Sequence, residues 1–122
     1  MREIKFRGKR TDNGDWIYGY LMVWKDGYTN INIEEEGFQV NPETVGQFTG
    51  LKDKNGKEIY GEGDIYKDAN GIISIVKMAV DGWALFPVKK GTPVRNLYWH
   101  NVCDKTKGEV IGNKWDNPEL LK

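Results

Sequence analysis

Five Asn-Gly or Asp-Gly dipeptides recur along this chain of 122 residues, and they constrain its fold more than any other feature of the sequence. Each supplies two adjacent residues that tolerate positive φ, which the tight type I′ turn of a β-hairpin requires. The spacing of the turns therefore predicts a series of short antiparallel strands. The five dipeptides are Asn13-Gly14, Asp26-Gly27, Asn55-Gly56, Asn70-Gly71 and Asp81-Gly82.

Runs of β-forming residues lie between these turns. We expect residues 15–24 to pair with 28–33 across Asp26-Gly27, and residues 71–80 to pair with 83–88 across Asp81-Gly82. Two further strands are predicted at residues 94–103 and 109–113.

The segment 15–24 is apolar on both faces, which predicts a strand that is central in its sheet or covered on each side. Because side chains alternate along a strand, one face carries Trp16, Tyr18, Tyr20, Met22 and Trp24, and the other carries Ile17, Leu21 and Val23.

Signals for helix are few. Asn41-Pro42-Glu43 and Asn117-Pro118-Glu119 each place a capping residue before a proline, which predicts two short helical turns, the last at the C-terminus. We therefore expect an all-β, mainly antiparallel protein with several small twisted sheets or partly open barrels. Residues 1–122 are expected to form a single domain, and two β lobes meeting near residues 50–64 are an open alternative.

Composition excludes several classes of protein. Lys+Arg and Asp+Glu are 18 each, so the net charge is zero, and there is one Cys. A disulfide framework is excluded, and a generally polybasic nucleic-acid or membrane protein is not indicated. The longest uncharged stretch, Trp16 to Trp24, is much shorter than the roughly 20 residues of a membrane helix. The basic first ten residues precede no apolar segment, so we expect no signal peptide and a cytoplasmic location.

His100 and Cys103 are the one pair that resembles a catalytic dyad. Residues three apart on a strand point to opposite faces, so an extended segment would keep imidazole and thiol apart. Together with Asp104 they could supply two or three metal ligands if the backbone turned, which is short of a closed zinc site. We therefore expect no catalytic residue, no metal and no cofactor.

Glu62 and Asp64 are a second candidate pair, because an extended backbone would project both carboxylates to one side. Glycoside hydrolysis uses two carboxylates, but across a cleft that the sequence does not indicate. The favoured interpretation is structural, with Asp64 accepting hydrogen bonds from nearby backbone N–H groups.

The basic opening of the chain and the tryptophans are the two hints of binding. Exposed rings on a sheet can stack bases, although large side chains more often pack a small core. The basic strip, a local footprint for nucleic acid, consists of Arg2, Lys5, Arg7, Lys9 and Arg10. The tryptophans are Trp16, Trp24, Trp83, Trp99 and Trp115.

Three segments resemble the YopX-type family of small phage and prophage proteins. They are "REIKFRGK" at the start, "VNPETVGQFTGLKDKNGKEIYGEGDI" in the middle and "EVIGNKWDNPELL" at the end. The resemblance implies a mainly-β fold without an assigned activity, in the cytoplasm of a bacterium that carries a phage or prophage. No catalytic residue follows from it.

Two functional hypotheses remain. The first is a non-enzymatic phage accessory protein that acts through protein contacts, as a homo-oligomer or with a host or phage protein, joined through edge strands. The alternative is a nucleic-acid-binding module that uses the basic strip and exposed aromatic side chains. An enzyme is the least favoured class, because reactive groups are few.

Overall fold

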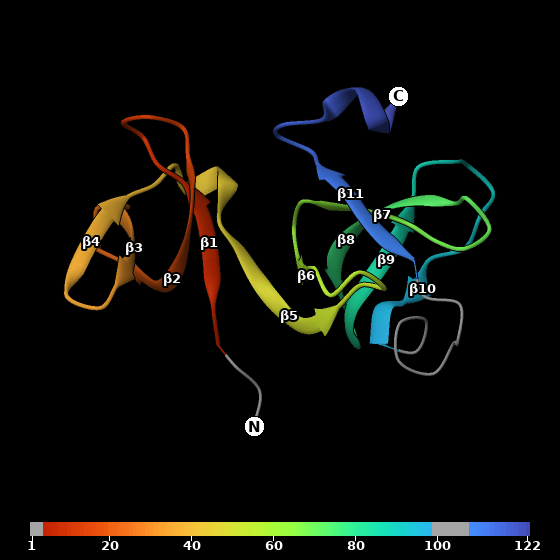
Figure 1. Ribbon diagram of the computed structural model, residues 1–122, viewed down its shortest axis with the longest axis horizontal. Helices are drawn as coiled ribbons and strands as arrows, with labels where there is room; N and C mark the ends of the chain where they lie inside the picture. The colour runs from red at the N-terminus through yellow and green to blue at the C-terminus, as the bar shows by residue number, and fades with distance from the viewer. Residues whose placement is uncertain (1–3, 99–107) are drawn as a thin grey trace. The chain divides into compact units, whose positions relative to one another are not determined.

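Antiparallel strands make up most of the regular structure, which confirms the predicted all-β class (Figure 1). The computed structural model describes residues 4–98 and 108–122. The chain divides into two compact units, an N-terminal unit of residues 1–48 and a C-terminal unit of residues 49–122.

In the N-terminal unit, the strands follow the order β4-β3-β2-β1-β5. The elements are β1 (Phe6–Lys9), β2 (Trp16–Val23), β3 (Thr29–Ile33), β4 (Glu36–Gln39), the 3-10 turn η1 (Pro42–Thr44) and the start of β5 (Gly46–Lys52). The predicted pairing of 15–24 with 28–33 is confirmed, with Tyr20 opposite Asn32. An isolated antiparallel β-bridge pairs Arg10, which follows β1, with Val40, which follows β4.

The core of the N-terminal unit lies on one face of this sheet. Its buried members are Ile17, Ile31 and Val40, with Phe6, Leu21, Phe38 and Val45 packed against them. Side-chain alternation along β2 therefore places Tyr18, Tyr20 and Met22 on the opposite face, which we call the outer face. The predicted division of this segment into two faces is confirmed. The strand is central, between β1 and β3, yet these outer side chains are exposed.

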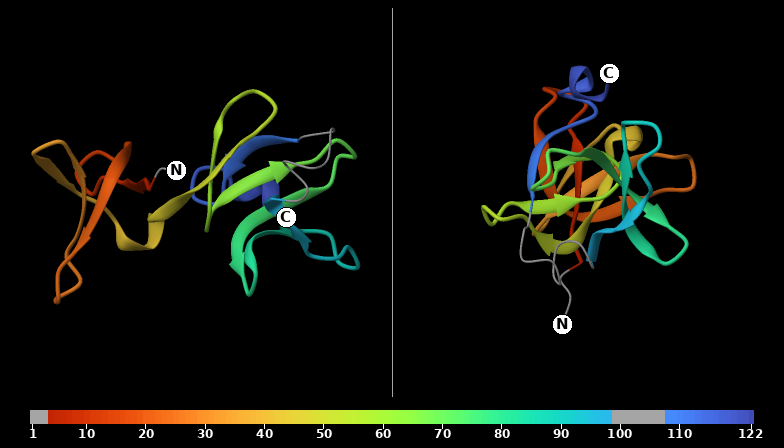
Figure 2. Two further views of the ribbon diagram at one scale, coloured as in Figure 1. Left: turned by 90° about the horizontal axis from the view of Figure 1, so that it is seen from below. Right: turned by 90° about the vertical axis from the view of Figure 1, so that its right-hand side faces the viewer.

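In the C-terminal unit, β6 (Glu58–Tyr60) pairs with the later part of β5, and a five-stranded sheet follows the order β10-β9-β8-β7-β11 (Figure 2). Its strands are β7 (Asp64–Lys67), β8 (Ile73–Ala79), β9 (Gly82–Pro87), β10 (Arg95–Asn96) and β11 (Glu109–Asn113). The predicted pairing across Asp81-Gly82 is confirmed. The buried core cluster contains Ile59, Tyr66, Val76, Leu85, Leu97 and Val110.

The predicted strand at 94–103 is wrong in its extent. The strand β10 ends at Asn96, and Leu97 and Tyr98 have helical backbone. Leu97 is fully buried in the core cluster, so the chain turns where its side chain enters the core. Residues 99–103 of the predicted strand lie outside the described residues.

The predicted turns are confirmed in position, but their expected type I′ geometry is wrong, because the Asn or Asp of each dipeptide lacks the positive φ that this turn type requires. All five glycines of the Asx-Gly dipeptides have positive φ, from 75° at Gly14 to 128° at Gly82. Both short helical turns are present, η1 and η3 (Pro118–Leu121). Asn41 caps η1 by accepting the Glu43 N–H. Asn117 makes no such capping bond, and its side-chain oxygen instead accepts the N–H of Asn113.

Two Asp-x-Asn-Gly loops in the C-terminal unit share one hydrogen-bond pattern. Asp53 accepts the backbone N–H groups of Asn55 and Lys57 at 2.9 Å each. Fifteen residues later, Asp68 accepts those of Asn70 and Ile72 at the same distances. Buried Asp carboxylates therefore close both loops, in addition to the Asn-Gly pairs that the sequence predicts.

The start of β11 is held next to these loops. The Val110 N–H donates to Asp53 Oδ2 at 2.8 Å, and the Lys54 N–H donates to the carbonyl of Gly108. The Gly108 N–H donates to the buried Tyr66 hydroxyl at 2.7 Å. Burial raises the pKa of this tyrosine. Side chains distant in sequence thus fix the position of β11.

Candidate functional site

The basic strip does not form one surface. In the β1–β2 register, Arg7 lies opposite Tyr18 and Lys9 lies opposite Trp16, so both cations project from the outer face. Lys5 shares their face by alternation. Arg10 projects the other way, with its guanidinium 4.6 Å from the centroid of the Phe38 ring.

The cations on the outer face lie against aromatic rings. The guanidinium carbon of Arg7 is 4.5 Å from the Trp16 ring centroid, and Lys9 Nζ is 5.5 Å from it. Lys5 Nζ is 5.4 Å from the Phe48 ring centroid. Arg7 is also 5% exposed. Trp16 is therefore occupied as a cation–π partner within the unit, which reduces its use as a stacking platform for a base.

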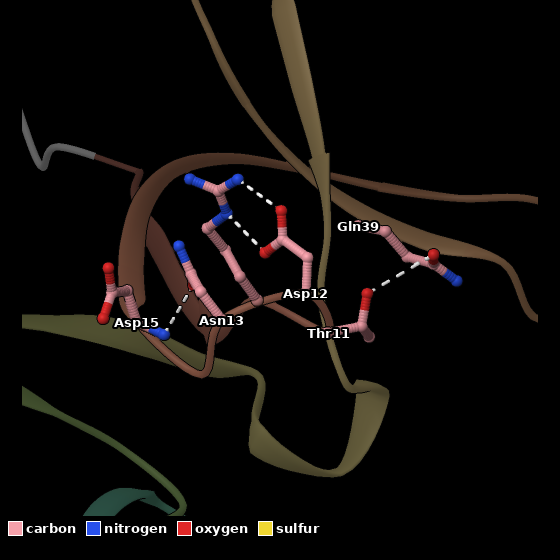
Figure 3. Close-up of polar contacts among 6 residues, drawn as sticks. Thr11, Asp12, Asn13, Asp15 and Gln39 are labelled. Atoms are coloured by element: carbon pink, nitrogen blue, oxygen red, sulfur yellow. Dashed lines mark hydrogen bonds and ion pairs between the residues drawn. The ribbon is translucent and has the colours of Figure 1, made fainter.

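Arg10 is engaged at the β1–β2 turn, next to the contacts drawn in Figure 3. Its Nε and Nη2 donate to the two carboxylate oxygens of Asp12 at 2.9 and 2.6 Å. This hydrogen bonding raises the pKa of Arg10 and lowers the pKa of Asp12. In the same turn, Thr11 Oγ1 donates to Gln39 Oε1 and Asn13 Oδ1 accepts the Asp15 N–H (Figure 3).

A hollow of about 490 Å³ adjoins this turn, and Lys9, Arg10, Gln39 and Thr44 are among the residues that line it. Several of its polar groups are satisfied by each other. The Thr44 hydroxyl accepts the Lys9 N–H and donates to the Asn41 carbonyl. The hollow therefore presents no convergent set of polar groups that would indicate a small-molecule ligand.

The most distinctive surface of the N-terminal unit is a row of exposed apolar side chains. It runs along β2 and over the tip of the β2–β3 hairpin. Tyr20 is 68% exposed and Met22 is 45% exposed, and the other members are exposed to a similar degree as Met22. We call this surface the aromatic row, and it consists of Tyr18, Tyr20, Met22, Trp24 and Tyr28.

The row is ordered by its own contacts. At the hairpin tip, the Trp24 and Tyr28 rings pack edge-to-face, with centroids 5.3 Å apart and planes at 74°. Beside the row, Asn30 and Asn32 lie opposite Met22 and Tyr20 on β3. The Asn32 amide donates to the Met22 sulfur at 3.1 Å. The result is an apolar stripe with side-chain amides along one side and cations along the other.

Each carboxylate of the Glu62 and Asp64 pair accepts a backbone N–H. Asp64 is buried, and its Oδ2 accepts the Tyr60 N–H at 2.7 Å, as the structural interpretation predicted. Glu62 is exposed, and its Oε1 accepts the Met78 N–H. Glu62 has φ of 66°, so the backbone turns here and does not project both carboxylates to one side.

The remaining candidates cannot be placed. Arg2, Trp99, His100, Cys103 and Asp104 lie outside the described residues. Within residues 4–98 and 108–122, no group of three or more His, Cys, Asp or Glu side chains could hold a metal ion. No helix in these ranges is long and apolar enough to span a membrane.

Of the comparisons with known proteins, the match to a family model shows how this chain is related to other proteins. A search of curated proteins returns no match for this chain. The family model described as "YopX protein" matches residues 5–122, which covers nearly the whole chain and includes all three segments that suggested the resemblance except the first residues. The chain therefore belongs to the YopX family.

Proposed function

We propose that this chain is a non-enzymatic accessory protein, encoded by a phage or prophage, that acts in the bacterial cytoplasm through contacts with other proteins. The phage origin and the location rest on the implications of the YopX family. The contact role rests on one observation, which is the aromatic row on the outer face of the N-terminal unit.

The composition of the row supports protein contacts. Tyr, Trp and Met are enriched in the cores of protein interfaces, where Lys, Glu and Asp are depleted. Five such side chains with roughly half of their surface exposed present about 500 Å² of mainly apolar area. Monomeric proteins seldom expose larger contiguous patches, and patches of this size are often functional.

The alternative, nucleic-acid binding, is supported by the cations of β1 beside the row. Three observations weigh against it. Arg7 and Lys9 lie against Trp16, and Arg10 lies on the other face with Asp12 as its partner. Residues 1–48 carry six Lys and Arg against eight Asp and Glu, a net charge of −2. A surface that binds through phosphate neutralisation needs a basic excess.

Site-specific photo-cross-linking tests the proposal. A benzophenone amino acid replaces Tyr20, and the matched control carries it at Val80, an exposed apolar position in the β8–β9 turn. In bacteria that express the full chain, we expect protein adducts from position 20 and none from position 80. Equal adducts from both positions, or none from position 20, would contradict a contact role for the row.

Fluorescence anisotropy with labelled single- and double-stranded DNA and RNA separates the two hypotheses. We expect no binding at protein concentrations of tens of micromolar at either about 50 or about 200 mM salt. Micromolar binding that weakens steeply at the higher salt concentration would favour the nucleic-acid alternative instead.

A further inference from the structure

The aromatic row has opposite charges at its two ends. The hairpin tip carries exposed Lys25 directly after Trp24. At the other end, the β3–β4 turn carries exposed Glu34 and Glu35. Because Tyr20 lies opposite Asn32 in an antiparallel pair, Glu34 lies near the level of Tyr18.

The acidic end and the basic end of the row lie at about equal distances from its midpoint, so a two-fold arrangement of two copies can place them opposite each other. From position 18 to position 24 the strand rises about 20 Å, and its midpoint lies between Tyr20 and Met22. A two-fold axis that lies between two copies, parallel to their sheets and perpendicular to β2 at this midpoint, turns the two outer faces toward each other and exchanges the two ends of the row. A second copy placed face to face in this way would bring Lys25 of each copy beside the glutamates of the other.

We propose that the aromatic row binds the same row of a second copy of this chain, about a two-fold axis near Tyr20 and Met22. This inference rests on the proposed contact function and names its partner. In such an interface the same patch serves both subunits, so it must be self-complementary. Aromatic rings and the Met22 thioether pack on each other, and Asn30 and Asn32 carry both a donor and an acceptor in each side chain.

Charge is consistent with this pairing. The tip also contains Asp26, but its carboxylate accepts the Tyr28 N–H at 3.0 Å and is thereby held toward its own hairpin. Lys25 at the tip thus supplies the cation that faces two acidic side chains. Such rim pairs add modest affinity and set the orientation of the two copies.

The area predicts a weak but specific dimer. About 500 Å² of row from each copy gives about 1,000 Å² in total, which is at the lower limit for specific interfaces. Interfaces of this size are typical of weak, transient complexes, so the test covers micromolar dissociation constants. Of the edge strands, the joining surface expected from the sequence, β4 and β10 are less suited, because β4 has four residues and begins with Glu36, and β10 has two residues.

Sedimentation velocity of the purified full chain, from about 1 to about 200 μM, tests the dimer across a micromolar Kd. We expect a concentration-dependent shift from monomer to dimer. Tyr20→Glu should weaken the dimer at least tenfold, and Val80→Glu should leave it unchanged, with both variants checked for folding by circular dichroism. A monomer throughout, or a dimer that Tyr20→Glu does not weaken, would overturn the inference.

A charge exchange tests the orientation. Lys25→Glu alone and Glu34→Lys with Glu35→Lys should each weaken the homodimer, because like charges then meet at both ends. An equimolar mixture of these two variants should form a heterodimer, because both ends are again of opposite charge. Failure of the mixture to associate better than either variant alone would overturn the two-fold arrangement.

The two proposals can fail separately. If the chain stays monomeric while the cross-linker at position 20 captures a different protein, the second-copy inference is overturned and the contact function stands. If position 20 yields no protein adduct and the chain is monomeric, both are overturned.

Discussion

The indole ring of Trp83 lies directly on the α-carbon of Gly61, with no room for a β-carbon between them. The ring of Trp115 covers Gly63 in the same way. The two glycines of the 61–63 turn are thus required by the side chains that pack on them, and the turn residue Glu62 between them carries the positive φ. The Gly-x-Gly segment therefore allows two tryptophan rings to pack directly against the backbone.

Gly61→Ala should therefore destabilise the protein by about 1–3 kcal/mol through overpacking. The measurement is the free energy of unfolding from urea titration. In a Trp83→Ala background the same substitution should cost much less, because the ring that it meets is gone. Equal costs in the two backgrounds would show that the contact with Trp83 is not the cause.

Asp53→Ala should destabilise the C-terminal unit by about 3 kcal/mol, because three backbone N–H groups lose their acceptor. Hydrogen exchange gives a local measurement of the same effect. The Val110 N–H should exchange faster in the variant than in the wild type, since Asp53 is its acceptor. Unchanged protection of this N–H would contradict the role assigned to the carboxylate.

Asp68 should make stability depend on acid pH. Burial raises its pKa, but hydrogen bonds from Arg95 and from backbone N–H groups outweigh burial, so the pKa is lowered from its ordinary value of 3.8. A group of this kind stabilises the folded state above its unfolded pKa, and the contribution is lost as the pH falls through the folded pKa.

The measurement is the difference in unfolding free energy between the wild type and Asp68→Asn over a pH series. The difference should be constant above about pH 5 and should narrow below about pH 4, where the wild-type carboxyl group becomes neutral. Asp12→Asn is the control, because Asp12 is exposed and should give no resolvable difference. A gap that widens toward acid pH would contradict the assignment.

Substitutions on opposite faces of the β2–β3 pair should differ sharply in their effect on stability. Ile31→Ala should cost about 2–5 kcal/mol, because Ile31 is fully buried in the small core of the N-terminal unit. Tyr20→Ser should change stability by less than about 0.5 kcal/mol, since Tyr20 is exposed. Thermal unfolding followed by circular dichroism measures both, and a large loss for Tyr20→Ser would assign that ring to folding rather than binding.

The local signals in the sequence predicted the hairpins well. Asp26-Gly27 and Asp81-Gly82 carry residues that accept positive φ, so both turns and both strand pairings could be derived from them. The hairpin between β3 and β4 was missed as a pairing, because its turn contains Glu34 with φ of 54° and no glycine.

Contacts between residues far apart in the sequence could not be predicted from local sequence patterns. Asp53 and Asp68 belong to a repeated Asp-x-Asn-Gly pattern that the sequence shows, but their carboxylates also bind strands far along the chain, Asp53 through Val110 of β11 and Asp68 through Arg95 of β10. For the candidate site, alternation placed Tyr18, Tyr20 and Met22 on one face, and this was confirmed. Their exposure could not be derived, because it depends on which face the core of the unit covers.

The hydrogen bond between Asp53 and Val110 joins residues that are 57 positions apart. During synthesis, the loop containing Asp53 emerges long before its partner, so this hydrogen bond cannot form until Val110 has also emerged. Closing such a long loop is slow compared with forming a hairpin. The N-terminal unit, built from successive hairpins, can assemble while the ribosome is still translating, and the C-terminal unit is completed only after β11 has emerged.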